Sequence, residues 1–352
     1  MTPIRDLLLW GVRHKVFSGA QATLARRGES PLTVCAGTTS FLEGSPVGRE
    51  TLFDIASITK VFTGAAVLRM VDCGELDLNA PIQEILDELN GGPAGNATLA
   101  QLMAHEAGFE PWAPFFEEIE RKDRGTSGAR REMIRMIMNH PTARSPGEEA
   151  AYSDLGYILL GEILERKSGR SLDEVIAEEI TGPLRLKSVR SAPVRGAVAA
   201  TEDCPWRGRV ISGEVHDDNA WTMGGVAGHA GLFATSGDVA GFGVAWLESL
   251  EAGAWLSQEL AARSIARRPL GRGLGWDLKS SSGSMAGDLM GERTFGHLGF
   301  TGCSLWVDPD AGLSVALLTN RVHPSRDNDA IREFRPRFHD LANIPKNDES
   351  NH

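Results

Sequence analysis

The segment that most constrains this chain is Thr51–Lys60, because it carries a serine and a lysine into the start of a helix. Residues 51–56 are β-favouring and apolar, and the apolar run 61–71 that follows predicts a helix. Ser57 falls near the first turn of that helix, where unpaired N–H groups and the helix dipole favour negative charge. Lys60 lies on the same helix face. The pair provides the groups that acyl transfer needs, although a capping serine with a solvated lysine is the simpler alternative.

Composition sets the outer bounds. At 352 residues the chain can hold one large or two medium domains with a proper core. The net charge of −11 argues against a nucleic-acid or anionic-membrane surface, and the longest apolar runs are too short to span a bilayer. Residues 1–10 include Asp6 and lack a cleavage-site pattern, so they predict an amphipathic helix. We expect a cytoplasmic protein, or a periplasmic one if a leader has been removed.

Strand patterns occur near both ends of the chain, with helical patterns between them. Residues 4–15 predict a helix, and the stretches 19–29 and 32–37 predict two strands around a glycine turn. The segment from about 75 to 215 is mostly helical. After residue 270 strand-like segments return, and a closing helix is predicted over 328–342.

These patterns predict an α+β fold, in which an antiparallel sheet is built from both termini and flanked by helices, with a mostly helical lobe inserted. We expect one composite domain over residues 1–352. Its α/β lobe would comprise about 1–75 and 220–345, its helical lobe about 76–219, and 345–352 would be a flexible tail. The site should lie in the crevice between the lobes.

The second element of the candidate site is centred on Tyr152, one of two tyrosines in the chain. It directly precedes Ser153 and Asp154, which cap the apolar helix predicted over 155–166. A tyrosine near a lysine can have its pKa lowered and can relay protons between nucleophile and leaving group. Packing beside the helix cap is the alternative role, and it is the simpler one if Ser57 is not catalytic.

The third element is the glycine-rich stretch 296–302, Gly-His-Leu-Gly-Phe-Thr-Gly, in the strand-rich part of the chain. Glycines in a strand let its backbone approach a ligand closely. An amide here would supply the second oxyanion donor beside the N–H of Ser57.

Together the three elements resemble the serine β-lactamase and penicillin-binding-protein family, in particular its class C-like esterases and D-amino-acid peptidases. The order and separation of the motifs are similar to the family's, and the resemblance covers roughly residues 17–320. The stretches 51–56, 102–108 and 224–238 match the family as well. The resemblance implies a β-lactamase/transpeptidase-like fold and a serine hydrolase that works through an acyl-enzyme.

The resemblance also implies roles for single residues. Ser57 is similar to the family's acylated nucleophile, Lys60 to its activating partner and Tyr152 to its catalytic tyrosine. The triplet His297-Leu298-Gly299 lies where the family carries Lys-Thr-Gly or His-Thr-Gly. This alignment makes the N–H of Phe300 the second oxyanion donor beside that of Ser57. A second alignment begins the triplet at Phe300, and the sequence leaves both open.

Two departures from the family pattern bear on the substrate. The commonest second motif is Tyr-x-Asn, whereas this chain has Asp154, and the third motif has His297 in place of lysine and Leu298 in place of threonine or serine. In relatives that bind β-lactams or peptidoglycan termini, the lysine and the hydroxyl help to hold a substrate carboxylate. That contact would be weakened by a largely neutral His297 and by Leu298, which offers no hydrogen bond. Asp154, if ionised, would repel the carboxylate unless Lys60 neutralises its charge. We expect these residues and Gly299 to bind a substrate that has no anionic group there.

The chain is therefore predicted to be an esterase or amidase with weak β-lactam turnover, acting on a small ester, amide or short peptide. A D-amino-acid-specific peptidase or carboxypeptidase and a true class C-like β-lactamase are the alternatives among enzymes. The alternative outside enzymes is a catalytically silent protein that binds a peptidoglycan fragment, although a pure binder has no need of Ser57, Lys60 and Tyr152 together. We expect no cofactor, no nucleic-acid partner and no membrane span. The oligomeric state stays open.

A metal site is the weaker interpretation of one acidic, histidine-containing stretch. His216, Asp217, Asp218 and His229 offer ligand atoms, but they lack a compact spacing such as H-E-x-x-H. A glycine-rich loop along the cleft, with His229 hydrogen-bonded inside it, fits better, and we expect no metal. His105 is expected to be structural or exposed.

Overall fold

The computed structural model describes residues 3–92 and 94–344. Its centre is an antiparallel six-stranded sheet in the order β2-β1-β11-β10-β9-β8. The strands are β1 (Gly19–Arg26), β2 (Leu32–Gly37), β8 (Asp277–Leu278), β9 (Phe295–Leu298), β10 (Ser304–Asp308) and β11 (Leu313–Thr319). Strands from the two ends of the chain meet where β1 pairs with β11, with Ala22 opposite Leu317. The predicted α+β class is confirmed.

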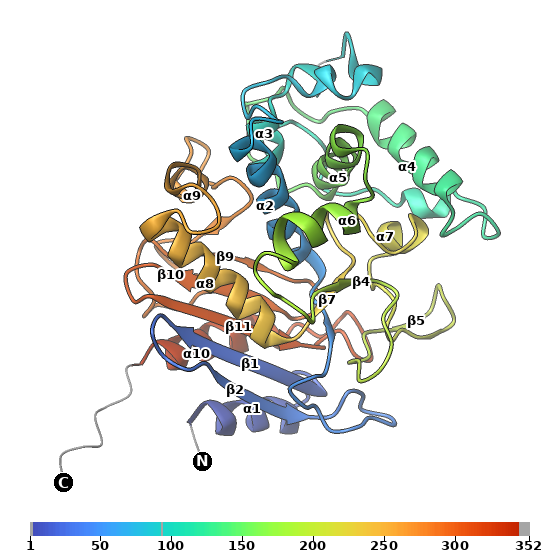
Figure 1. The fold of residues 1–352 in the computed structure, drawn as a ribbon. Helices are drawn as coiled ribbons and strands as arrows, with labels where there is room; N and C mark the ends of the chain where they lie inside the picture. The colour runs from blue at the N-terminus through green and yellow to red at the C-terminus, as the bar shows by residue number, and fades with distance from the viewer. Residues whose placement is uncertain (1–2, 93, 345–352) are drawn as a thin grey trace.

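Helices cover both faces of this sheet (Figure 1). One face packs on α1 (Pro3–Arg13) and α10 (Ile331–Asn343), and the other packs on α8 (Ser236–Ala252). Because both faces are covered, apolar residues of β11 point both ways: Leu317 joins the cluster under α1 and α10, and Leu318 joins the larger cluster with α8.

The remaining helices gather mainly above the sheet in the view of Figure 1. They are α2 (Thr59–Asp72), α3 (Leu99–Met103), α4 (Ser127–Asn139), α5 (Asp154–Ser168), α6 (Leu172–Ile176), α7 (Asp218–Thr222) and α9 (Gln258–Ile265). Short 3-10 turns connect them: η1 (Ala56–Ile58), η2 (Ile82–Glu84), η3 (Asp87–Leu89), η4 (Ala94–Asn96) and η5 (Phe115–Glu117). Helix α5 packs on α2, α3, α4 and α6, which makes it the centre of this group. Its cap is the predicted one, since Ser153 Oγ accepts the N–H of Gly156 at 3.2 Å.

The helical pattern expected from about 75 to 215 ends early, and this expectation is wrong for its last part. After the π-helical turn Ala177–Thr181 the chain forms the short strands β4 (Arg190–Ser191), β5 (Asp203–Cys204) and β6 (Arg209–Val210). Prolines and glycines in this stretch, such as Pro193 and Pro205, interrupt helical hydrogen bonding. Strand β4 completes a small sheet with β7 (Leu232–Ala234) and β3 (Phe53–Asp54), and β3 leads directly to Ser57.

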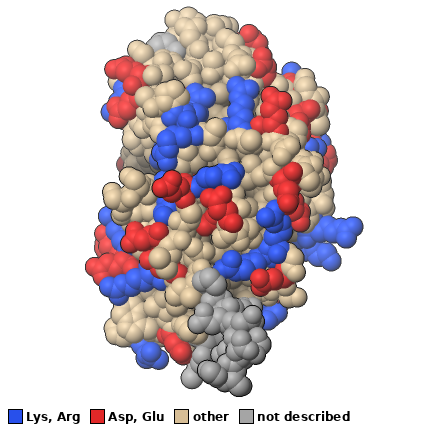
Figure 2. All heavy atoms as spheres, turned by 90° about the vertical axis from the view of Figure 1, so that its left-hand side faces the viewer, with Lys and Arg blue, Asp and Glu red and all other residues tan. Residues whose placement is uncertain are grey.

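The predicted division into an α/β lobe and a helical lobe stays a prediction, and the predicted tail, 345–352, lies outside the described residues. None of the described helices is long and apolar enough to cross a membrane. On the face drawn in Figure 2, the Lys and Arg side chains are interspersed with Asp and Glu and form no continuous basic band.

Candidate active site

Ser57 lies where the small sheet gives way to helix α2. It is the middle residue of the 3-10 turn Ala56–Ile58, which runs directly into α2. The carboxylate of Asp54 fixes the entry to this turn, because it accepts the N–H of Ala56 at 2.8 Å and that of His216 at 2.7 Å. Ala56 has a φ of 48°, a left-handed conformation that residues other than glycine rarely adopt. The turn before Ser57 is therefore strained and held in place by its neighbours.

Lys60 lies one helical turn after Ser57, and its side chain is fully buried. Its Nζ is 2.9 Å from Ser57 Oγ, 3.2 Å from the carbonyl oxygen of His229 and 2.7 Å from Asp154 Oδ1. Burial alone lowers the pKa of Lys60, but the Asp154 carboxylate and Tyr152 outweigh burial and raise this pKa above its ordinary value. Lys60 is therefore an ammonium ion that bridges the serine hydroxyl and the carboxylate.

Tyr152 lies against the same lysine, with Nζ 4.9 Å from the centroid of its ring. Burial raises the pKa of the Tyr152 phenol, and the charge of Lys60 and hydrogen bonds with Lys60 and Ser57 offset only part of that rise. The lowering by lysine that the sequence argument expected is present, but burial is the larger influence. Tyr152 is a neutral phenol at neutral pH, in contact with both members of the serine–lysine pair.

The third element borders the same cleft as Ser57. His297, on β9, is buried, and its ring centroid lies 5.9 Å from that of Tyr152. Burial lowers the pKa of His297 to about 4, so its ring is neutral at pH 7, as the sequence argument expected. Leu298 lines the cleft and offers no polar group. Phe300 lies at the rim, half exposed, with its ring on that of the neighbouring His216. Both alignments place residues along this cleft, so the start of the third motif at His297 stays a prediction.

The loop after β9 is joined tightly to the segment before Ser57. Thr301 Oγ1 donates to the carbonyl oxygen of Asp54 at 2.7 Å. A side chain on Gly299 would meet the carbonyl oxygen of Ile55 at 2.6 Å, so only glycine fits there without movement.

Two backbone donors, the N–H groups of Ser57 and Phe300, lie at this junction. Among the described residues, neither the N–H of Ser57 nor that of Phe300 has a hydrogen-bond partner. Both residues line the cleft. This is the arrangement expected of the two donors of an oxyanion pocket, and their role stays a proposal.

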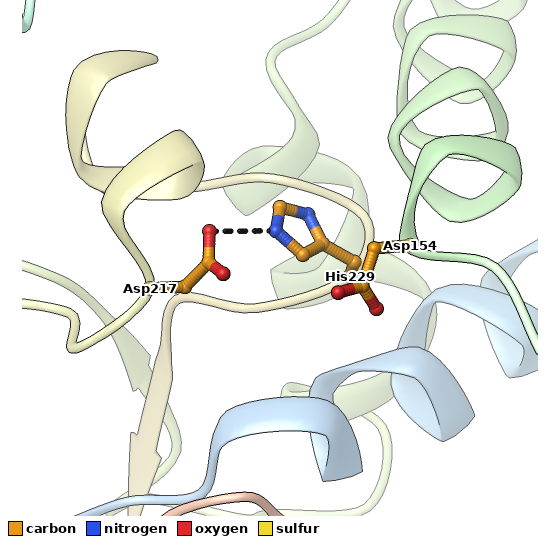
Figure 3. Close-up of side chains that lie close together, drawn as sticks. All are labelled: Asp154, Asp217 and His229. Atoms are coloured by element: carbon orange, nitrogen blue, oxygen red, sulfur yellow. Dashed lines mark hydrogen bonds and ion pairs between the residues drawn. The ribbon is translucent and has the colours of Figure 1, made fainter. Parts of the chain in front are cut away.

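Figure 3 shows a cluster of two carboxylates and a histidine, made of Asp154, Asp217 and His229. Their potential ligand atoms lie within 4.8 Å of one another. His229 Nε2 is 2.8 Å from Asp217 Oδ1, which is the loop hydrogen bond expected for His229. Although burial favours the neutral carboxyl, His229 and the N–H of Ala220 hold the pKa of Asp217 well below its usual range. Each carboxylate already has a partner, Asp154 in Lys60 and Asp217 in His229, so we keep the prediction of no metal.

The cleft has a volume of about 740 Å³. Its charged lining comprises Asp54, Asp154, Asp217, Asp218, Asp277, Asp329, Arg321, Arg326, Arg332 and Arg335. Trp112 and Phe300 add exposed aromatic surface.

The sequence prediction gave two residues no role in the site, and it expected one of them, His105, to be structural or exposed. His105 is buried, and its ring lies 4.6 Å from that of Tyr152, while its Nδ1 accepts the N–H of Ser153 at 3.0 Å. His105 packs against Tyr152. Its place inside the family-like stretch 102–108 was the sequence signal that could have predicted this role. The other is Arg335, an arginine within the apolar stripe of α10.

The antiparallel sheet, the surrounding helices and a serine that lines the cleft and contacts a buried lysine define a class, the serine hydrolases of the acyl-transfer type. A model of the family described as Beta-lactamase matches residues 10–336. The chain therefore belongs to the β-lactamase family, and it is a serine hydrolase.

Proteins similar to this chain have names that denote hydrolases. The chain is 30% identical over 347 residues to N-acetylmuramyl-L-alanine amidase of Bacillus subtilis (strain 168), covering 87% of this chain and 78% of the relative. It is 32% identical over 306 residues to the protein of Escherichia coli O157:H7 named "Putative D-alanyl-D-alanine carboxypeptidase", covering 78% and 70%. The solved structure titled "EstCE1, a hydrolase with promiscuous acyltransferase activity" superposes with a TM-score of 0.79 at 20% identity over 97% of each chain, which shows the shared fold.

Proposed function

We propose that the protein is an esterase or amidase that hydrolyses small esters and amides through an acyl-enzyme on Ser57, with weak β-lactam turnover. The observation that carries this proposal is the contact of one buried ammonium group, Lys60 Nζ, with both Ser57 Oγ at 2.9 Å and Asp154 Oδ1 at 2.7 Å. The names of the amidase relative and of the hydrolase with the same fold agree with this substrate class.

The contacts suggest a proton route for acylation. Ser57 Oγ attacks the substrate carbonyl carbon, and its proton passes to Lys60 Nζ as Lys60 gives a proton to Asp154. The oxyanion forms against the N–H groups of Ser57 and Phe300. When the bond to the leaving group breaks, Tyr152 donates its phenol proton to that group and regains a proton from Lys60, which in turn recovers the one held by Asp154. In deacylation water is the nucleophile, its proton follows the same route, and Ser57 Oγ is the leaving group that Tyr152 protonates. The enzyme therefore neither gains nor loses a proton over the cycle.

The expected preference for substrates without an anionic group rests on two side chains. His297 is neutral because burial lowers its pKa to about 4, and Leu298 offers no hydrogen bond. The charge of Asp154 is taken up by Lys60, so this carboxylate adds little repulsion. Weak β-lactam turnover therefore follows from a missing attraction for the substrate carboxylate.

A D-amino-acid-specific carboxypeptidase is the second candidate, and one observation favours it. Arg332 lines the cleft with a side chain that is 71% exposed, and its paired acid, Asp329, is 3.5 Å away. An exposed guanidinium is suited to a substrate carboxylate. The name of the Escherichia coli relative agrees with this candidate.

A substrate panel tests both candidates on the wild-type protein and the Ser57→Ala variant. The panel comprises p-nitrophenyl acetate and butyrate, N-acetylmuramyl-L-alanine, a D-alanyl-D-alanine peptide and a chromogenic cephalosporin. Ser57-dependent turnover of the esters or the muramyl amide, with slow cephalosporin cleavage, supports the proposal. Faster turnover of the D-alanyl-D-alanine peptide selects the second candidate. Fast cephalosporin turnover contradicts the weak-turnover prediction, and the absence of both turnover and acylation supports a binding protein.

We also propose a cytoplasmic location. All four cysteines are free, and Cys73 is exposed, which suits a compartment that keeps thiols reduced. Fractionation of the source cells with an antibody to the protein tests this location, and recovery in the periplasmic fraction would contradict it.

A further inference from the structure

A buried arginine lies directly behind the third element. Arg335, on α10, is 7% exposed, and its Nη2 donates to the carbonyl oxygen of Gly299 at 2.7 Å and to that of Cys303 at 2.8 Å. The turn between these two residues is closed by the N–H of Gly299, which donates to the carbonyl oxygen of Cys303 at 2.7 Å. One guanidinium nitrogen therefore holds both ends of the loop that contains Phe300.

In the part of the chain that the structure describes, no carboxylate forms an ion pair with this guanidinium. The charged groups that act on Arg335 are two other arginines, Arg321 and Arg332, and no carboxylate of the described residues is among them. Burial lowers the pKa of Arg335 to about 10, so the side chain stays cationic at neutral pH. Its Nε is also buried without a partner. A buried, unpaired charge costs folding free energy, so its place behind the loop calls for a role.

Peptide geometry connects this contact to the reaction site. In a trans peptide the C=O and the next N–H point in opposite directions. The Gly299 carbonyl oxygen is fixed on Arg335, so the N–H of Phe300 points away from α10. That N–H has no partner among the described residues, and Phe300 borders the cleft together with Ser57.

A second arginine holds the other side of Phe300. Arg321 Nε donates to the Phe300 carbonyl oxygen at 2.8 Å, and its guanidinium carbon lies 4.5 Å from the centroid of the Phe300 ring. Both peptide planes around Phe300 are thus fixed by cations. Charge-assisted bonds to a carbonyl polarise the amide and make its N–H a stronger donor.

We propose that Arg335 is a positioning residue for the oxyanion pocket: it aims the Phe300 N–H into the cleft and supplies a fixed positive charge behind it. This inference rests on the proposed acyl-enzyme function at Ser57. Electrostatic stabilisation of this kind acts on the transition state and leaves substrate binding unchanged.

The test compares Arg335→Met and Arg335→Lys with wild type, using p-nitrophenyl acetate in pre-steady-state bursts. The burst separates the acylation rate constant from the dissociation constant of the substrate. We expect Arg335→Met to slow acylation about tenfold to hundredfold, less than the roughly 10²–10³ lost with an oxyanion donor itself. The dissociation constant should stay within about twofold, and Arg335→Lys should recover part of the rate because it keeps the charge.

A transition-state analogue gives a readout that a purely structural role would not move. Methylboronic acid becomes tetrahedral when Ser57 Oγ adds to it, so its affinity should fall in parallel with the acylation rate. The matched control is Arg337→Met, an exposed arginine on the same helix, which should change neither quantity. Thermal melting checks folding, and if Arg335→Met does not fold, Arg335→Lys carries the comparison.

Three results would overturn the inference. These are unchanged acylation in folded Arg335 variants, a loss confined to the substrate dissociation constant, or retained boronate affinity despite slow acylation. Turnover that persists in Ser57→Ala would overturn the proposed function together with this inference. Ser57-dependent turnover with normal acylation in Arg335→Met would overturn the inference alone.

Discussion

Two buried cations lie at the cleft that Ser57 lines, and the protein holds them in opposite ways. Lys60 is paired with a carboxylate, Asp154, at 2.7 Å and also touches Ser57. Arg335 has two carbonyl oxygens and no carboxylate. A lysine can exchange its proton when its surroundings change, whereas a guanidinium keeps its charge. Lys60 and its partners (the lysine side) are therefore suited to proton transfer. Arg335 and the loop it holds (the arginine side) are suited to provide a permanent electrostatic field.

The largest expected effect comes from removing the lysine. Lys60→Met leaves Ser57 without its proton partner and Asp154 without its counter-ion. We expect kcat/KM for p-nitrophenyl acetate to fall about 10³-fold, within the range of general acid–base catalysis. The control is Lys167→Met, an exposed lysine on α5, which should behave as wild type. Near-normal activity in a folded Lys60→Met protein would contradict the assignment of proton transfer to Lys60.

A finer change on the same side is Asp154→Asn, which restores the family's common Tyr-x-Asn motif. Without the carboxylate, burial dominates and the pKa of Lys60 falls, so Lys60 itself must act as the base. We expect kcat/KM at pH 7 to drop about tenfold, with activity rising as pH increases and Lys60 loses its proton.

The matched control for that variant is Asp217→Asn. Asp217 lies in the same cluster (Figure 3) but pairs with His229. Its pH–rate profile should keep the wild-type shape. Profiles of the same shape in Asp154→Asn and wild type would contradict the route through Asp154.

The arginine side is tested by moving the loop that Arg335 holds. In Gly299→Ala the new methyl group would lie 2.6 Å from the carbonyl oxygen of Ile55, so the loop must shift. We expect acylation to slow about tenfold and the free energy of unfolding to fall by about 1–3 kcal/mol. Gly48→Ala is the control, because a methyl group there meets nothing within 4 Å. Normal acylation in Gly299→Ala would show that the loop position is not critical.

Two buried histidines, His297 near Lys60 and His339 near Arg335, differ from these cations because burial keeps them neutral. Burial lowers the pKa of His297 to about 4 and that of His339 to about 3, against 6.5 in the ordinary state. The unfolded chain therefore binds more protons below pH 6.5, and stability is lost as pH falls from there towards 4. We expect about 1–2 kcal/mol less stability per histidine at pH 5 than at pH 7.

Denaturant unfolding at pH 7 and pH 5 measures this loss. His339→Gln, which can keep the hydrogen bond to Ser304, should show a smaller pH dependence than wild type. An equal dependence in both proteins would show that other groups cause it.

The parts of the site that sequence reasoning found are local. Ser57 and Lys60 are three residues apart, so helix periodicity alone places them together, and the Ser153 cap positions Tyr152 by a local signal. The sheet from both termini followed from strand patterns, and its family fold followed from motif order. By contrast, the short strand β4 depends on pairing with β7, a distant segment, which no local pattern shows.

The arginine side was not predicted, because its contacts are long-range. Arg335 donates to a carbonyl oxygen 36 residues earlier in the chain, and no local sequence pattern around Gly299 predicts this contact. The α10 helix itself was expected. Within it Arg335 lies among the buried apolar residues Ile331, Phe334 and Phe338, so an arginine inside the apolar stripe was the one available signal.

Intact mass measured during turnover tests the acyl-enzyme at Ser57 directly. The wild-type protein and Ser57→Ala are mixed with p-nitrophenyl butyrate, quenched in acid within the burst and analysed whole and after digestion. We predict that wild type gains one acyl group, on the peptide that contains Ser57, and that the variant gains none. Ester turnover by wild type with no acylated protein, or with an adduct at another residue, would contradict an acyl-enzyme at Ser57.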